Sequence, residues 1–134
     1  MKFFLPVLIS FVGLLLGAFF IYKGIDKHFL SPCITFGPDS TLPANYRNAM
    51  TALCSSGFTK IIGFLEIAAG LLLIVPRTRL AGIFIIMPII IAIFLFHLLL
   101  DNRSAELFET GIPMAITLLV FIYHQKDWKV IIAR

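Results

Sequence analysis

Two ionisable side chains interrupt long apolar runs in this sequence, and they are the residues best placed to do chemistry. Glu66 lies near the middle of the apolar segment 58–75, and His97 lies close to the end of segment 80–100. Each segment has about the 20 residues that a helix needs to cross a bilayer core of roughly 30 Å. A carboxylate at mid-membrane costs about 2.5–3.5 kcal/mol, so Glu66 should face the interior of a helix bundle and have a partner there.

Two interpretations of Glu66 remain open. As a functional group it would be a proton relay or the polar end of a small-molecule pocket. As a structural group it would be a protonated or paired carboxylate that only ties helices together. His97 should lie roughly 4–5 Å below the membrane surface at 1.5 Å per residue, with Glu66 several ångströms deeper. The two side chains could therefore touch directly or through a water molecule.

The histidines do not predict a haem or metal site. A bis-histidine haem needs two axial ligands at matched depth on facing helices. His97 is near the outer end of its span, whereas His28 is in or near a loop and His124 is at the opposite membrane face. The sequence also lacks zinc-type Cys/His spacing, a Gly-rich phosphate loop and a Ser-His-Asp order. Soluble catalysis is therefore not expected, and no cofactor can be named.

Both cysteines, Cys33 and Cys54, fall in the loop 24–57. In an oxidising compartment they would form a disulfide closing about 20 residues, worth roughly 3 kcal/mol in the chain-entropy model. A structural staple is one interpretation, and a redox-active pair is the other. The sequence has no CxxC motif that could receive electrons from such a pair, which counts against a self-contained thiol oxidoreductase.

The elements that must position these residues are membrane helices. With 60% apolar residues in 134, the chain predicts a single domain, 1–134, built as an all-α bundle of four transmembrane helices. The expected spans are 3–23, 58–75, 80–100 and 107–124, with an extramembrane loop that contains a short interfacial helix over 43–55. The first apolar run is longer than the core of a signal peptide and has no small-residue cleavage site, so it should be retained.

The distribution of positive charge favours an orientation with both termini inside. The net charge of +4 comes from residues at helix ends and loops, so it does not predict a nucleic-acid partner. The short hinge Pro76-Arg77-Thr78-Arg79 is the strongest indication of this orientation, because positive charges close to spans resist translocation. The inner segments then hold six basic residues against five outside; the six are Lys2, Arg77, Arg79, Lys126, Lys129 and Arg134. We expect a location in a bacterial cytoplasmic membrane, with the loop 24–57 outside.

Several motifs resemble the DoxX-like family of small four-helix membrane proteins. The resemblance covers about residues 13 to 101, and the fourth span is similar only in being apolar. At the position four residues after Pro88, where relatives often have Asn, this chain has Ala92, so any role of that amide is missing. The residues that carry the resemblance are Gly17, Phe20, Gly24, Lys27 and Phe29; then Met50, Leu53 and Ser56-Gly57-Phe58; then Glu66 and Gly70-Leu71-Leu72-Leu73; and finally Pro88-Ile89-Ile90, Phe94 and Phe96-His97-Leu98.

The resemblance implies a function in membrane redox chemistry. Some members are associated with oxidoreductase assemblies that handle thiols or sulfur compounds, and one archaeal relative with thiosulfate:quinone oxidoreduction. The matching Lys27 could join Glu66 and His97 in one polar cluster by extending back along the first helix. The leading expectation is an accessory subunit whose outward-opening cluster binds a quinone-like or other lipophilic ligand. A thiol–disulfide oxidoreductase using the loop cysteines, or a non-catalytic assembly factor, remains the alternative.

Overall fold

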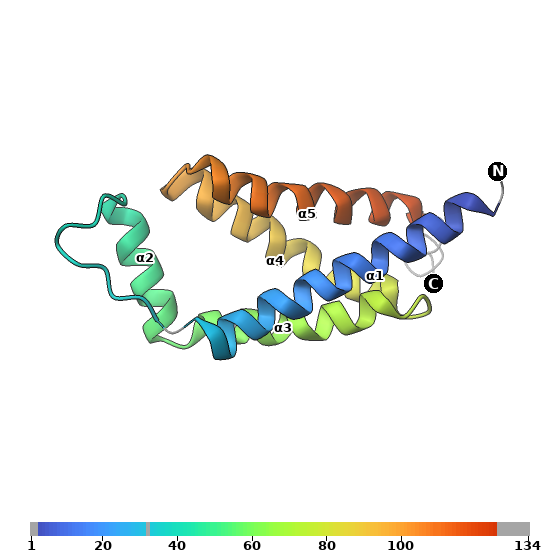
Figure 1. Cartoon of the computed structure of the whole chain (residues 1–134), viewed down its shortest axis with the longest axis horizontal. Helices are drawn as coiled ribbons and strands as arrows, with labels where there is room; N and C mark the ends of the chain where they lie inside the picture. The colour runs from blue at the N-terminus through green and yellow to red at the C-terminus, as the bar shows by residue number, and fades with distance from the viewer. Residues whose placement is uncertain (1–2, 32, 126–134) are drawn as a thin grey trace.

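The computed structural model describes residues 3–31 and 33–125, and every regular element in this part of the chain is helical. Figure 1 shows the long helices running roughly side by side, with the short helix α2 across one end. The elements are α1 (Phe4–Ile25), the π-helical segment η1 (Asp26–Leu30), α2 (Ala44–Ser55), α3 (Phe58–Ile74), α4 (Arg79–Leu100) and α5 (Ser104–Tyr123). The predicted all-α class is confirmed. Lys2 and the basic tail 126–134, which entered the charge count, lie outside the described residues.

Three helical stretches in the described residues are long and apolar enough to cross a membrane: Phe4–Leu30, Arg79–Leu100 and Ser104–Tyr123. The 17-residue helix α3 reaches about 26 Å at 1.5 Å per residue, close to a bilayer core of roughly 30 Å. Together α2 and α3 form a pair bent by 74°, which gives up to four spans. The first helix continues through η1 to Leu30, beyond the predicted end at residue 23.

Apolar side chains cover the outside of the bundle, as contact with lipid requires. Leu99, Phe108 and Val7 are among the large hydrophobic residues that stay exposed. The buried core is small and lies along the middle of the bundle; it comprises Leu16, Phe20, Ala69, Leu73, Ile83, Ile86, Ile90 and Val120. Because water would oppose so much exposed apolar surface, the chain is an integral membrane protein.

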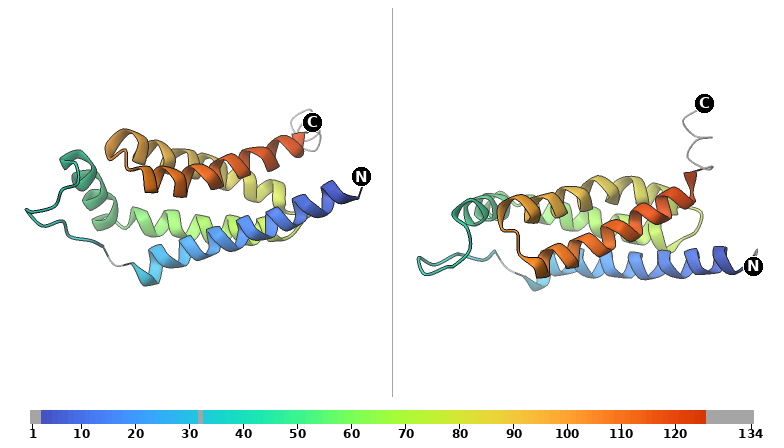
Figure 2. Two further views of the ribbon diagram at one scale, coloured as in Figure 1. Left: turned by 45° about the horizontal axis from the view of Figure 1, so that its top comes forward. Right: turned by 90° about the horizontal axis from the view of Figure 1, so that it is seen from above.

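Glycines bring α1 and α3 into backbone contact. The two helices lie antiparallel along most of their length (Figures 1 and 2). A Cβ added to Gly17 would lie 2.6 Å from the carbonyl oxygen of Gly70, and one added to Gly63 would lie 2.9 Å from that of Gly24. Such distances leave no room for a side chain, so these two glycine pairs set the spacing of α1 and α3.

The turn between α2 and α3 depends on Gly57. Its φ of 77° lies in the left-handed region, which glycine adopts at little cost. This residue redirects the chain by the 74° that separates the two helices. Helix α2 therefore lies across the end of the bundle, which is called the α2 end below (Figure 2).

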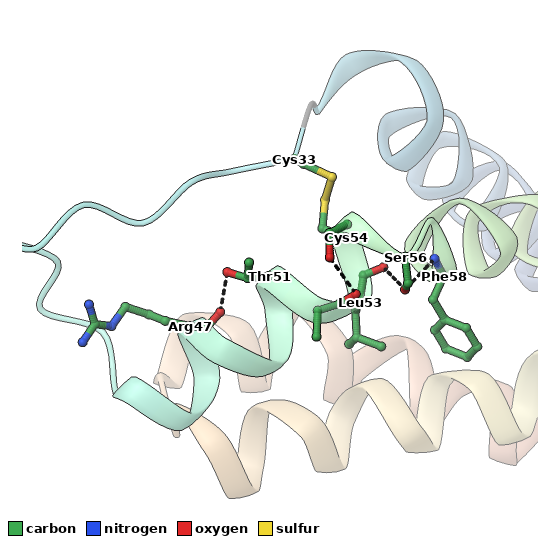
Figure 3. Close-up of a disulfide and its surroundings, with 9 residues drawn as sticks. Cys33, Arg47, Thr51, Leu53, Cys54, Ser56 and Phe58 are labelled. Atoms are coloured by element: carbon green, nitrogen blue, oxygen red, sulfur yellow. Dashed lines mark hydrogen bonds between the residues drawn. A yellow bond between two sulfur atoms is a disulfide. The ribbon is translucent and has the colours of Figure 1, made fainter.

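The disulfide joins the loop after η1 to the last turn of α2. The Cα atoms of Cys33 and Cys54 are 5.6 Å apart, and Figure 3 shows the bond between them. The predicted pairing is therefore present, and it ties α2 to the end of the first helix. Tyr46 of α2 is buried and packs its ring against Phe96 and His97 of α4.

The opposite end of the bundle, where α3 turns into α4, is called the hinge end. Its Arg79, one of the hinge charges that favour the orientation with both termini inside, has a side chain that is only 3% exposed. Its Nε donates a hydrogen bond to the carbonyl oxygen of Leu73 at 3.1 Å, which satisfies an acceptor at the end of α3. A Cβ on Gly13 would lie 2.5 Å from that Nε, so Gly13 makes room for this guanidinium.

Candidate functional site

A charged pair between α1 and α3 is the centre of the candidate site. Glu66 lies on the inner face of α3 and is 2% exposed. The Nζ of Lys27 donates to both its carboxylate oxygens, at 2.7 Å to Oε1 and 2.6 Å to Oε2. The structure thus places Lys27 against Glu66, giving the buried carboxylate a cationic partner.

Local backbone geometry brings Lys27 to this position. The lysine belongs to the π-helical segment η1, whose wider turn changes the direction of side chains relative to an α-helix. A Cβ on Gly63 would lie 3.1 Å from the Cβ of Lys27, so the missing side chain at residue 63 allows the lysine to lie against α3. The sequence predicts Lys27 about one turn beyond the apolar run of the first helix, and the structure continues the helix through this residue.

His97 borders the same cavity but has different partners. Its Nδ1 lies 3.2 Å from Oδ1 of Asp101, the residue directly after the end of α4, and its Nε2 lies 3.8 Å from Glu106. Within the described residues, its hydrogen-bond partner is therefore Asp101 rather than Glu66. His97 and Glu66 share a cavity wall, as the expected cluster requires, without a direct bond between them.

A second polar network at the α2 end fixes the position of His97. Arg103 donates from Nε to Asp101 at 2.6 Å and from Nη2 to the hydroxyl of Tyr46 at 3.3 Å. The bond to Asp101 raises the pKa of Arg103, and burial raises the pKa of the Tyr46 hydroxyl, so both stay protonated. Sequence reasoning missed this network, although the four-residue spacing of His97 and Asp101 on one helix is a signal for it.

A further ion pair crosses from α1 to α5. Lys23 and Glu109 are bonded through Nζ and Oε1, and both side chains remain partly exposed. The sequence places Glu109 near a membrane edge but gives no sign that Lys23 is its partner. This pair is important because α1 and α5 are otherwise in contact at few points.

These groups surround a cavity of about 160 Å³, called the chamber below. This volume would hold about five water molecules at ~30 Å³ each, or a small polar head group. Apolar rings and chains from Phe19, Phe20, Ile90 and Ile93 complete its wall. Its charged lining comes from α1, η1, α3, α4 and α5; it includes Lys23, Lys27, Glu66, His97, Glu106 and Glu109.

Neither cysteine is among the chamber-lining residues described. Cys33 is exposed and Cys54 is half-buried, so the disulfide belongs to the loop rather than to the chamber. Within residues 3–31 and 33–125, no group of three or more His, Cys, Asp or Glu side chains is arranged to hold a metal ion.

The fold and its exposed apolar surface define a small all-α integral membrane protein with up to four spans. No family model matches the sequence, no curated protein is significantly similar to it, and no solved structure matches its fold. The resemblance to the DoxX-like family therefore rests on the motifs quoted above.

Proposed function

We propose that the chain is a DoxX-like accessory subunit of a membrane oxidoreductase system, and that its chamber binds the polar head group of a quinone-like or other lipophilic ligand. The observation that supports this proposal best is the Lys27–Glu66 pair, in which a buried carboxylate and its partly exposed lysine partner both line the chamber. The proposal includes the orientation with both termini inside, so that the α2 end faces outward from a bacterial cytoplasmic membrane.

The chamber offers the hydrogen bonds that such a head group needs. Lys27 and His97 can donate to carbonyl oxygens, and the carboxylate of Glu66 can accept from a hydroxyl. An oxygen atom between these groups would replace part of the Lys27–Glu66 bonding with charge-assisted bonds of similar strength. Both the carbonyl and the hydroxyl form of a quinone-like ring could therefore be bound in the same place.

The volume of the chamber argues against a purely structural role. A helix-packing or assembly factor would be expected to fill the space around Glu66, because empty space in a core is destabilising. Instead about 160 Å³ remains between the charged groups. A bound head group or a few water molecules would occupy this space and satisfy the polar atoms.

Thiol–disulfide exchange is the second candidate function, and the exposure of Cys33 supports it. A disulfide whose Cys33 residue is exposed can be approached by a thiolate from another protein. The chain would then need an external dithiol partner, since its own sequence has no CxxC motif. Binding in the chamber and exchange at the loop are separable, because the cysteines do not line the chamber.

The binding proposal is tested with purified protein in lipid nanodiscs and decylubiquinone as the probe. We expect Glu66→Gln and Lys27→Gln each to raise the Kd about tenfold, because a hydrogen bond to a charged group is worth roughly 1.5–3 kcal/mol. Lys60→Gln is the matched control: it removes one exposed positive charge near the start of α3, away from the chamber. Absence of binding to the wild type, or equal binding by Glu66→Gln, would overturn the proposal.

A further inference from the structure

An apolar groove runs between α1 and α5 and meets the chamber at one end. It encloses about 620 Å³, within the range of roughly 300–1,000 Å³ typical of ligand sites. From Leu8 to Phe19 it extends about 16 Å along α1 at 1.5 Å per residue. The opposite wall is formed by residues of α5 between Phe108 and Val120.

The groove and the chamber share two wall residues, Phe19 and Glu109. The two spaces are therefore neighbours, with the charged groups gathered at the α2 end and only apolar side chains from Phe19 toward the hinge end. Such a site has one polar end and one long apolar arm. This shape matches a molecule with a compact polar head and a single hydrocarbon chain.

The interface between α1 and α5, called the α1–α5 seam, is held by different contacts from the other helix interfaces of the bundle. Glycines bring α1 against α3, and α4 packs against both α3 and α5. By contrast, α1 and α5 make few contacts, and the Lys23–Glu109 ion pair bridges them beside the chamber. Because few other contacts join α1 and α5, this interface has the least packing to lose when it opens.

We propose that the site takes a single-chain amphiphile with an uncharged head, which reaches the chamber from the bilayer through the α1–α5 seam and leaves its hydrocarbon chain in the groove. This inference rests on the proposed function, because it assumes that the head group binds beside Glu66. The head is uncharged because both lysines of the chamber already have carboxylate partners, Lys27 with Glu66 and Lys23 with Glu109. The other two carboxylates of its wall are bonded as well, Glu106 to Arg103 and Asp26 to the hydroxyl of Ser31. A charged head would leave one of those partners unpaired in an apolar setting.

Tryptophan substitutions in the groove test the position of the chain. Leu15 of α1 lines the groove and is 51% exposed, whereas its neighbour Leu14 does not line it and is 48% exposed. On α5, Leu119 lines the groove at 64% exposure, whereas Leu118 does not and is 47% exposed. Each pair offers the same substitution at similar exposure, so a folding defect would affect the control as well.

Binding is measured in nanodiscs with decylubiquinone and with the same benzoquinone ring lacking the decyl chain. We expect Leu15→Trp and Leu119→Trp to raise the Kd of decylubiquinone at least about tenfold and to change that of the tailless ring less than twofold. Leu14→Trp and Leu118→Trp should leave both values within twofold. Comparing each variant with the wild type for one probe removes the effect of partitioning into lipid.

The outcomes separate this inference from the proposed function. Suppose the groove variants bind decylubiquinone like the wild type while Glu66→Gln weakens the binding of both probes. The proposal for the groove is then overturned, and the proposal for the chamber is supported. If the groove variants weaken the binding of both probes equally, the decyl chain does not lie in the groove and this inference is overturned. If neither probe binds the wild type, both proposals fail.

Discussion

Lys27 and Glu66 come from separate membrane helices, yet Nζ of the lysine lies within 2.7 Å of both oxygens of the carboxylate. The close approach of α1 and α3 at Gly24 and Gly63 makes this contact possible. The pair is therefore a product of helix packing as well as of charge. It connects the stability of the bundle with the chemistry of the chamber.

The first prediction concerns the coupling of the two charges. Lys27→Gln in the wild-type background should destabilise the protein by about 3 kcal/mol, because it leaves a buried carboxylate without its cation. The same substitution in a Glu66→Gln background should cost less than half as much. Reversible unfolding in mixed micelles would measure this double-mutant cycle. Equal costs in the two backgrounds would show that the pair is not coupled.

The second prediction concerns the glycines at the α1–α3 interface. Gly63→Ala and Gly17→Ala should each destabilise the bundle by about 1–3 kcal/mol, since the added methyl group meets backbone atoms. Gly37→Ala is the control, because a Cβ there has no atom within 4 Å. Thermal unfolding of the three variants tests this. Gly63→Ala should also weaken probe binding by displacing Lys27, and an unaltered Kd would contradict that link.

The third prediction separates the disulfide from the chamber. Replacing both Cys33 and Cys54 with Ser should lower stability by roughly 3 kcal/mol, because the bond closes a loop across a sequence separation of 21. Decylubiquinone binding should change less than twofold, since neither cysteine lines the chamber as described. Loss of a cellular redox activity without loss of stability would instead favour thiol–disulfide exchange.

The fourth prediction concerns orientation. Pro76 and Ser104 are both exposed, at the hinge end and the α2 end respectively. In a cysteine-less background, a membrane-impermeant maleimide should label Ser104→Cys in intact cells and should label Pro76→Cys only after the membrane is opened. Labelling of Pro76→Cys from outside would reverse the proposed orientation.

Much of the fold could be predicted because membrane helices have a strong local signal. Apolar length predicts the spans, and the short helix expected over 43–55 corresponds to α2. Burial of Glu66 follows from the cost of a charge in lipid. These inferences need no knowledge of how the helices are arranged.

The partners of the polar groups could not be predicted in the same way, because they depend on tertiary arrangement. Lys23 and Glu109 are 86 residues apart in sequence and meet only once α5 lies beside α1. Arg79 is buried because Gly13 of another helix leaves space for it. The π-helical turn that positions Lys27 likewise has no reliable sequence signal.

A structure of the wild-type protein determined in native lipid would test the binding account most directly. The account predicts non-protein density in the chamber within about 3 Å of the Glu66 carboxylate, continuing into the groove between α1 and α5. The same density should be weaker in both Glu66→Gln and Leu15→Trp, with the part in the groove lost first in Leu15→Trp. A chamber closed by side chains, or a Glu66 carboxylate turned toward lipid and away from Lys27, would contradict the account.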